Sequence, residues 1–225
     1  MKAQFATISK IGRRVHNEDA FLVINQSDDQ RWTGILCDGM GTTAFGIESS
    51  ESVLNSIANY WKKHTEESDS KEKVIHACKE AGQALNKKAY SLSFAEMGTT
   101  MVMASLEGDT LTVAHVGDSR CYVRRPNEGL LYQTEDHVSI GTGRLKRCFF
   151  SFRQSIAVPD VVQMKVKSGD RILLCSDGIY KSLPSEYLHV KMMDDKDLDE
   201  ILKDFDSYCE QCGDDNYTAI IAVVS

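Results

Sequence analysis

Residues 172–178 read Ile-Leu-Leu-Cys-Ser-Asp-Gly, an apolar run that ends in an acidic residue and a glycine. The length and composition of this run are typical of a buried strand, which would carry Asp177 to the strand end. Residues 33–41 repeat the design, because an apolar run leads into Asp38-Gly39-Met40-Gly41. A buried strand-end carboxylate is costly unless a cation lies beside it, so the two segments predict a shared cation site.

Three further acidic segments lie next to predicted strands. They are Arg14-Val15-His16-Asn17-Glu18-Asp19, Gly117-Asp118-Ser119-Arg120 and Asp215-Asn216. Glu18 and Asp19 are adjacent at the start of a strand, so their side chains begin on opposite faces of it. Carboxylate and carbonyl oxygens suit Mg²⁺ or Mn²⁺ better than Zn²⁺, so the segments together indicate a metalloenzyme.

Composition limits the class of protein. The chain has 225 residues, 42% apolar and 26% charged, with no Pro, Gly or Ser-rich linker, which predicts one globular domain over residues 1–225. A formal net charge of -7 argues against a nucleic-acid binder or an anionic-membrane binder. No apolar run is long enough for a membrane span, and no signal peptide opens the sequence. Seven scattered cysteines predict reduced thiols and a cytoplasmic protein, with Cys209 and Cys212 packing on a helix.

The apolar pattern predicts mostly antiparallel strands with helices packed outside them. Glycine-containing turns at 107–109 and 168–170 join neighbouring runs as hairpins do. Helical spacing predicts helices around 47–61, 74–85 and 198–208, and Asp69 with Glu72 has capping-box spacing. These features predict an α+β fold, an antiparallel β-sandwich flanked by pairs of helices in α-β-β-α layers. The predicted strands are 4–9, 20–25, 32–37, 99–106, 111–116, 121–125, 161–166, 171–175 and 218–224.

The order of these segments resembles the metal-dependent protein phosphatases of type 2C, in their bacterial-type form. The resemblance covers almost the whole chain and implies two antiparallel sheets between pairs of helices, in agreement with the layers predicted above. It also implies a protein-serine/threonine phosphatase. The matching segments are R-x-x-N-E-D at 14–19, D-G-M-G at 38–41, G-T-T at 98–100, G-D-S-R at 117–120, L-C-S-D-G at 174–178 and D-N-x-T at 215–218.

The resemblance implies a ligand set for two metal ions. Asp38 corresponds to the carboxylate that bridges both ions and is central to catalysis. Glu18 and the Gly39 carbonyl would bind one ion. Asp177 and Asp215 would bind the other.

The resemblance also implies residues around that core. Asp118 would hold a third, weaker ion together with Asp177. Asp19 would orient water ligands, and Asn216 would lie just outside the ligand set. Arg14 would bind the substrate phosphate, because a planar guanidinium matches two phosphate oxygens.

The implied chemistry is hydrolysis of phosphoserine or phosphothreonine by a hydroxide that bridges two Mn²⁺ or Mg²⁺ ions, without a phosphoenzyme. The implied substrate is a phosphorylated protein, and the enzyme would be paired with a serine/threonine kinase. We expect a monomer that binds neither nucleic acid nor membrane.

The chain departs from the family pattern at several positions. Met40 replaces the histidine of many eukaryotic members, and Thr42 replaces a usual glycine. The stretch 137–158 is well short of the family's usual flap, so the flap is expected to be small or absent. It carries the basic residues Arg144, Lys146, Arg147 and Arg153. His137 is expected to have a structural role in its loop.

Two other functions stay open from the sequence. One is a catalytically inactive relative that acts as a binding or regulatory module, although such relatives usually lose a metal-site aspartate. The other is a two-metal hydrolase of a small phosphate ester, because a shortened flap leaves less surface to select a protein.

Overall fold

Two five-stranded antiparallel sheets form the centre of the molecule, in a computed structural model that describes residues 1–26, 31–68 and 71–225. The predicted capping residue Asp69 lies outside the described residues. The strands of one sheet are β1 (Ala3–Lys10), β7 (Arg120–Arg125), β8 (Gly129–Gln133), β11 (Arg171–Cys175) and β12 (Tyr217–Val224), in the order β1-β12-β11-β7-β8. Those of the other are β2 (Asp19–Gln26), β3 (Arg31–Asp38), β5 (Met101–Glu107), β6 (Thr110–Val116) and β10 (Asp160–Lys165), in the order β10-β6-β5-β3-β2. A two-stranded ribbon of β4 (Gly98–Thr99) and β9 (Phe149–Phe150) completes the β-structure.

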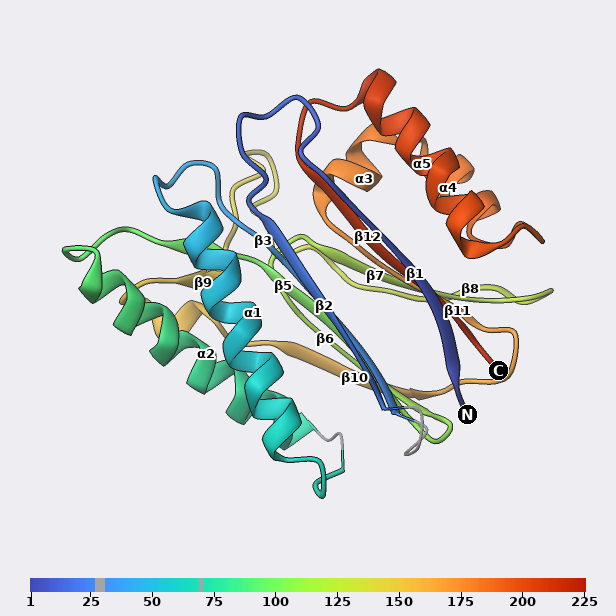
Figure 1. The fold of residues 1–225 in the computed structure, drawn as a ribbon, viewed down its shortest axis with the longest axis horizontal. Coiled ribbons are helices and arrows are strands. Elements are labelled where there is room, and N and C mark those ends of the chain that lie inside the picture. The colour runs from blue at the N-terminus through green and yellow to red at the C-terminus, as the bar shows by residue number, and fades with distance from the viewer. Residues whose placement is uncertain (27–30, 69–70) are drawn as a thin grey trace.

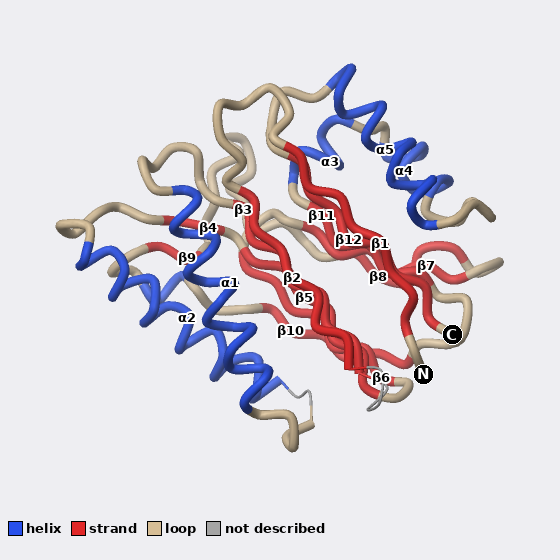
Figure 2. The backbone as a smooth tube through the Cα atoms, viewed as in Figure 1, coloured by secondary structure: helices blue, strands red, loops and turns tan. Residues whose placement is uncertain are grey.

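Helices cover both outer faces of the sandwich (Figures 1 and 2). The face of the β2–β10 sheet is covered by α1 (Gly46–Lys63) and α2 (Lys71–Ser91). The opposite layer contains α3 (Asp177–Ser182), α4 (Ser185–Lys191) and α5 (Leu198–Cys212). A separate 3₁₀ turn at Gln154–Ile156 lies between β9 and β10 in the chain. No helix in the described part of the chain is both long and apolar enough to cross a membrane.

Successive side chains of the central strands point to opposite faces of the sheet, and both faces are buried. In β3, Ile35 and Cys37 pack toward α1 and α2, whereas Trp32 and Leu36 pack between the sheets. β11 behaves in the same way, with Leu173 facing the α5 side and its neighbours facing the other sheet. Such strands read as continuous apolar runs, which is the pattern that the sequence shows at 33–37 and 172–175.

The predicted α+β sandwich in α-β-β-α layers is confirmed, with local differences. The predicted strand 99–106 is divided at Thr100 into β4 and β5. Where a second pair of helices is predicted, the structure has a group of three. The sequence does not predict α3 and α4, because they contain only 6 and 7 residues and are too short to show a helical period. Strands β8 and β9 were also not predicted, since they are short and only partly apolar.

Candidate active site

The acidic segments meet at one end of the sandwich, around an open cavity of about 380 Å³. Asp19 and Asp38 are paired residues at one end of β2 and β3. Asp177 follows β11 and Asp215 precedes β12, two strands that are themselves paired. The cavity is lined by eight of the nine predicted site residues, namely Arg14, Glu18, Asp38, Gly39, Asp118, Asp177, Asp215 and Asn216. Asp19 lies behind them.

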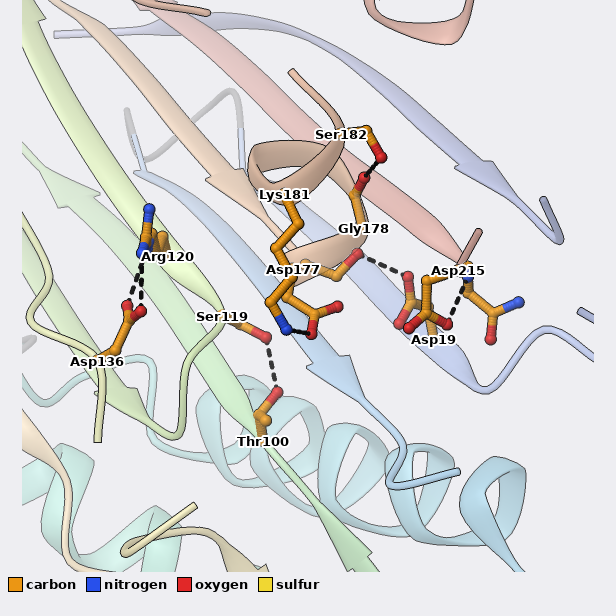
Figure 3. A network of polar contacts seen from close by, with 12 residues as sticks. Asp19, Thr100, Ser119, Arg120, Asp136, Asp177, Gly178, Lys181, Ser182 and Asp215 are labelled. Atoms are coloured by element: carbon orange, nitrogen blue, oxygen red, sulfur yellow. Dashed lines mark hydrogen bonds and ion pairs between the residues drawn. The ribbon is translucent and has the colours of Figure 1, made fainter. Parts of the chain in front are cut away.

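Asp38 is held at the end of β3 by the segment Gly98-Thr99-Thr100. The Asp38 carbonyl accepts hydrogen bonds from the Thr99 hydroxyl at 2.8 Å and from the Thr100 amide at 2.9 Å. The Asp38 amide donates to the Thr100 hydroxyl at 3.1 Å, and that hydroxyl bonds Ser119 in turn (Figure 3). Burial raises the pKa of Asp38 well above its ordinary value, and the neighbouring carboxylates raise it further. Thr99 and Thr100 therefore fix the backbone of Asp38, whose carboxylate is in surroundings that oppose its ionisation.

Asp19 lies beneath the cavity and contacts the segment before Asp177. Its Oδ2 accepts a hydrogen bond of 2.8 Å from the Ser176 hydroxyl, whereas its buried Oδ1 has no hydrogen-bond partner among the described residues. Burial raises the pKa of Asp19 to about 7. A buried acceptor without a donor is costly, so Oδ1 is suited to receive a hydrogen bond from a water ligand of a bound ion.

Glu18 lies against the start of α1, where glycine makes room for it. A Cβ atom at Gly46 would come within 2.4 Å of the Glu18 carboxyl carbon, so a larger residue there would displace the side chain. Burial raises the pKa of Glu18, while Arg14 lowers it. The positive end of the helix dipole favours a carboxylate at this position.

Asn216 fixes the loop that carries Arg14 and Glu18. Its amide group donates to the carbonyls of Ile11 at 2.7 Å and His16 at 2.8 Å, and its Oδ1 accepts from the Glu18 amide at 2.9 Å. All three bonds reach residues about 200 positions away in sequence, and all use side-chain atoms of Asn216. Asn216 therefore positions the loop through its side chain.

The basic residues of the site pair with the predicted ligands. Arg14 Nη2 donates to Asp215 Oδ2 at 2.8 Å, and Lys181 Nζ donates to Asp177 Oδ2 at 2.5 Å. Arg13 instead bonds the Gln211 carbonyl and does not line the cavity. Arg14, and not Arg13, is therefore available to a ligand in the cavity. The sequence pattern does not predict a site role for Lys181.

Asp118 lies on a turn that His137 holds from behind. The Gly117 amide donates to His137 Nδ1 at 3.1 Å, and the His137 amide donates to the Gly117 carbonyl at 3.0 Å. With Nδ1 as an acceptor, the His137 Nε2–H group donates to Asp160 Oδ2 at 2.9 Å. Burial, together with Asp177, raises the pKa of Asp118 to about 6. The structural role predicted for His137 is therefore to position the Asp118 turn.

His115, His137 and Asp160 form a second cluster of possible metal ligands, with ligand atoms within 4.8 Å of one another. The two imidazole rings are stacked 4.3 Å apart and nearly parallel, at 16°. A metal ion binds an imidazole nitrogen in the plane of the ring, so rings stacked in this way cannot both direct a nitrogen at one ion. We interpret the cluster as packing and hydrogen bonding that anchor the turn.

The flap is small but present at the rim of the cavity. Val138 and Leu145 pair across a short turn, and Leu145 lines the cavity. Arg147 bonds Asp160 at 2.9 Å and the Val158 carbonyl, so it anchors the flap. Arg144 and Lys146 are exposed on either side of Leu145.

Comparison with known proteins identifies relatives of the chain. A family model described as Protein phosphatase 2C matches residues 8–213. The serine/threonine phosphatase stp of Listeria monocytogenes serotype 4b is 30% identical, over 98% of this chain and 95% of that protein. A crystal structure of the catalytic domain of the serine/threonine phosphatase PstP, in complex with two manganese ions, matches with a TM-score of 0.82 at 25% identity, covering 98% of this chain and 97% of that one. A structure of the Mycobacterium tuberculosis phosphatase PstP/Ppp matches with a TM-score of 0.84 at 22% identity, over the full length of both chains.

Proposed function

Because this chain belongs to the protein phosphatase 2C family of metal-dependent serine/threonine phosphatases, we propose that residues 1–225 form one catalytic domain that uses the cavity described above. It hydrolyses phosphoserine and phosphothreonine by direct attack of water, without a phosphoenzyme. The observation that carries this proposal is the convergence of Glu18, Asp38, Asp177 and Asp215 on one cavity beside Arg14.

The carboxylates fit divalent cations with oxygen ligands. Asp38 and Asp118 both have pKa values raised by burial and by neighbouring carboxylates, which is the environment that a bound Mn²⁺ or Mg²⁺ would relieve. The unpartnered Oδ1 of Asp19 supports the same interpretation. We assign Asp38 as the bridging ligand, Glu18 and the Gly39 carbonyl to one ion, and Asp177 and Asp215 to the other. Asp118 is available to a third ion.

When bound, two cations would supply an activated water and would neutralise charge on the phosphoryl group. The chain itself binds and orients the substrate. Arg14 lies on the exposed side of the cavity, where its guanidinium can exchange Asp215 for two phosphate oxygens. Met40 and Leu145 form apolar parts of the lining.

We propose that the substrate is a phosphorylated protein produced by a serine/threonine kinase, and that the enzyme acts as a cytoplasmic monomer. All seven cysteines are free thiols, and six of them are buried, which supports a reducing compartment. The exposed cations of the flap support a negatively charged substrate.

A second candidate, hydrolysis of a small phosphate ester, is favoured by the small flap, which leaves little surface for a peptide. Mn²⁺-dependent phosphate release from a phosphothreonine peptide and from an aryl phosphate separates the candidates. We expect turnover of both, with a higher kcat/KM for the peptide, and loss of both in Asp38→Asn. Turnover of the aryl phosphate alone would favour the small ester, and no turnover of either would favour an inactive binding module.

A further inference from the structure

Lys181 places a positive charge beside the acidic cavity. It lies on α3, one helical turn after Asp177, and its Nζ donates to Asp177 Oδ2 at 2.5 Å (Figure 3). The pairing follows from helix geometry, because side chains four residues apart lie on the same face. Lys181 therefore occupies one carboxylate oxygen of a proposed metal ligand.

The charge of Lys181 also acts on other carboxylates of the cavity. Partial burial lowers its pKa, but Asp177, Asp118 and Asp38 together raise the pKa above its ordinary value. For Asp118, the effect of Lys181 opposes the rise in pKa that burial and Asp177 cause. Asp118 and Asp177 repel each other across this side of the cavity, and Lys181 offsets part of that repulsion at Asp118.

A divalent cation between Asp118 and Asp177 would share the Asp177 carboxylate with the Lys181 ammonium group. The ion would have to displace Lys181 from Asp177 Oδ2 and would be repelled by it afterwards. Among the ligands assigned to the two core ions, Asp177 has this contact with Lys181, whereas Glu18 and Asp215 have none in the described structure. Asp177 also belongs to the two-ion core, but a core ion keeps Asp38 and Asp215 as ligands, so competition is strongest for an ion that depends on Asp118 and Asp177.

We propose that Lys181 competes with an additional divalent cation at Asp118 and Asp177, so that the wild-type protein holds two ions tightly and a third only weakly. This inference rests on the proposed function, because it presupposes the two-ion core. Lys181 acts through its positive charge beside Asp177 and is not itself a metal ligand.

The test is the number and affinity of Mn²⁺ ions bound, measured by isothermal titration calorimetry on the full chain. We expect about two tightly bound equivalents for the wild type and a third in Lys181→Gln. The affinity for this third ion should be about tenfold higher in Lys181→Gln than in the wild type, which is a small Coulomb effect for charges in contact near a surface. Lys181→Arg keeps the charge and should behave as the wild type does. The double variant Lys181→Gln/Asp118→Asn should lose the extra ion.

Lys165→Gln is the matched control. Lys165 also pairs with an aspartate, Asp109, at 2.6 Å, and it is similarly exposed, at 71% against 60% for Lys181. It is the last residue of β10, beside the turn between β5 and β6, and it does not line the cavity. Its removal should leave Mn²⁺ binding unchanged. Identical Mn²⁺ binding by wild type and Lys181→Gln overturns the role of Lys181 alone. A wild type that binds no Mn²⁺ contradicts the proposed metal site itself.

Discussion

Arg14 Nη2 lies 2.8 Å from Asp215 Oδ2, which joins the proposed phosphate-binding residue to a proposed metal ligand. The side chains are 50% and 35% exposed, so the ion pair contributes little stability and can be exchanged at low cost. The attraction nevertheless keeps the guanidinium at the cavity before a substrate binds. The pair thus links the positions of phosphate and metal through one side chain.

Arg14→Ala should raise KM for phosphopeptides by about 10- to 100-fold, the range expected for loss of a charge-assisted hydrogen bond. Mn²⁺ affinity should be unchanged or slightly tighter, because Asp215 loses a competing cation. Steady-state kinetics and Mn²⁺ titration of the same variant measure both effects. Arg13→Ala is the control, since Arg13 bonds the Gln211 carbonyl. An unchanged KM in Arg14→Ala would remove Arg14 from phosphate binding.

Asp38→Asn should lower kcat by at least ~100-fold, the scale seen when one key electrostatic group is lost. The same change should stabilise the metal-free protein, because burial and the other carboxylates oppose ionisation of Asp38. We expect Tm in chelator to rise by about 2–4 °C for each kcal/mol gained. Activity and thermal unfolding on one preparation check both expectations. Full turnover by the variant would contradict the bridging role.

The stability of the metal-free protein should fall as pH rises. The pKa values of Asp19 and Asp118 are raised from 3.8 to about 7 and about 6 in the folded state. Between the ordinary pKa of 3.8 and these raised pKa values, the folded state binds more protons than the unfolded state. The stability that these two groups contribute is therefore present at low pH and is lost as pH rises through their pKa values in the folded state. Urea unfolding in chelator between about pH 5 and pH 7.5 should show the loss. Saturating Mn²⁺ should remove it, and Asp19→Asn should reduce the slope.

The sequence predicted which carboxylates line the cavity better than it predicted which residues hold them in place. Strand ends carry Asp38 and Asp177 into the cavity, and both are visible as apolar runs that stop at Asp-Gly. The contacts of Thr99 and Thr100 with Asp38, and of Asn216 with the loop at 11–18, join segments distant in the chain. Hydrogen bonds of this kind have no periodic signal in a single sequence.

Lys181 and Leu145 show two other limits of the sequence. Lys181 faces Asp177 only because a six-residue helix begins at Asp177, and so short a helix has no apolar period. Leu145 reaches the cavity because the flap turns back between Val138 and Leu145. The position of a loop residue depends on turn geometry, which the apolar pattern does not specify. The layers, in contrast, follow from patterns spread over many residues.

His137→Ala should destabilise the protein by about 1–3 kcal/mol, because the buried Gly117 amide loses its acceptor. His137→Asn offers an oxygen near the position of Nδ1 and should recover much of that loss, although it loses the contact with Asp160. The same order should appear in kcat, since the Gly117 turn carries Asp118. Denaturant unfolding and turnover of both variants provide the measurement. Equal destabilisation by Ala and Asn would show that the hydrogen bond to Gly117 is unimportant.

The last prediction concerns Arg144 and Lys146, the exposed cations on either side of Leu145 at the cavity rim. Exposed charges attract a phosphorylated peptide over long range, and salt screens them over about 8 Å at physiological ionic strength. Arg144→Gln/Lys146→Gln should therefore lower kcat/KM for a phosphopeptide by about two- to fivefold at low salt and flatten its salt dependence. Turnover of an aryl phosphate whose ring carries no charge should change less, because a small substrate interacts more weakly with the cations at the rim.

Lys62→Gln/Lys63→Gln removes the same charge from the far end of α1 and serves as the control. Arg147 is left intact because it anchors the flap to Asp160 and the Val158 carbonyl. If the flap variant and the α1 variant change kcat/KM and its salt dependence equally, only net charge matters. If the flap variant alone loses rate at low salt and converges on the wild type at high salt, the two cations capture substrate from their position at the rim.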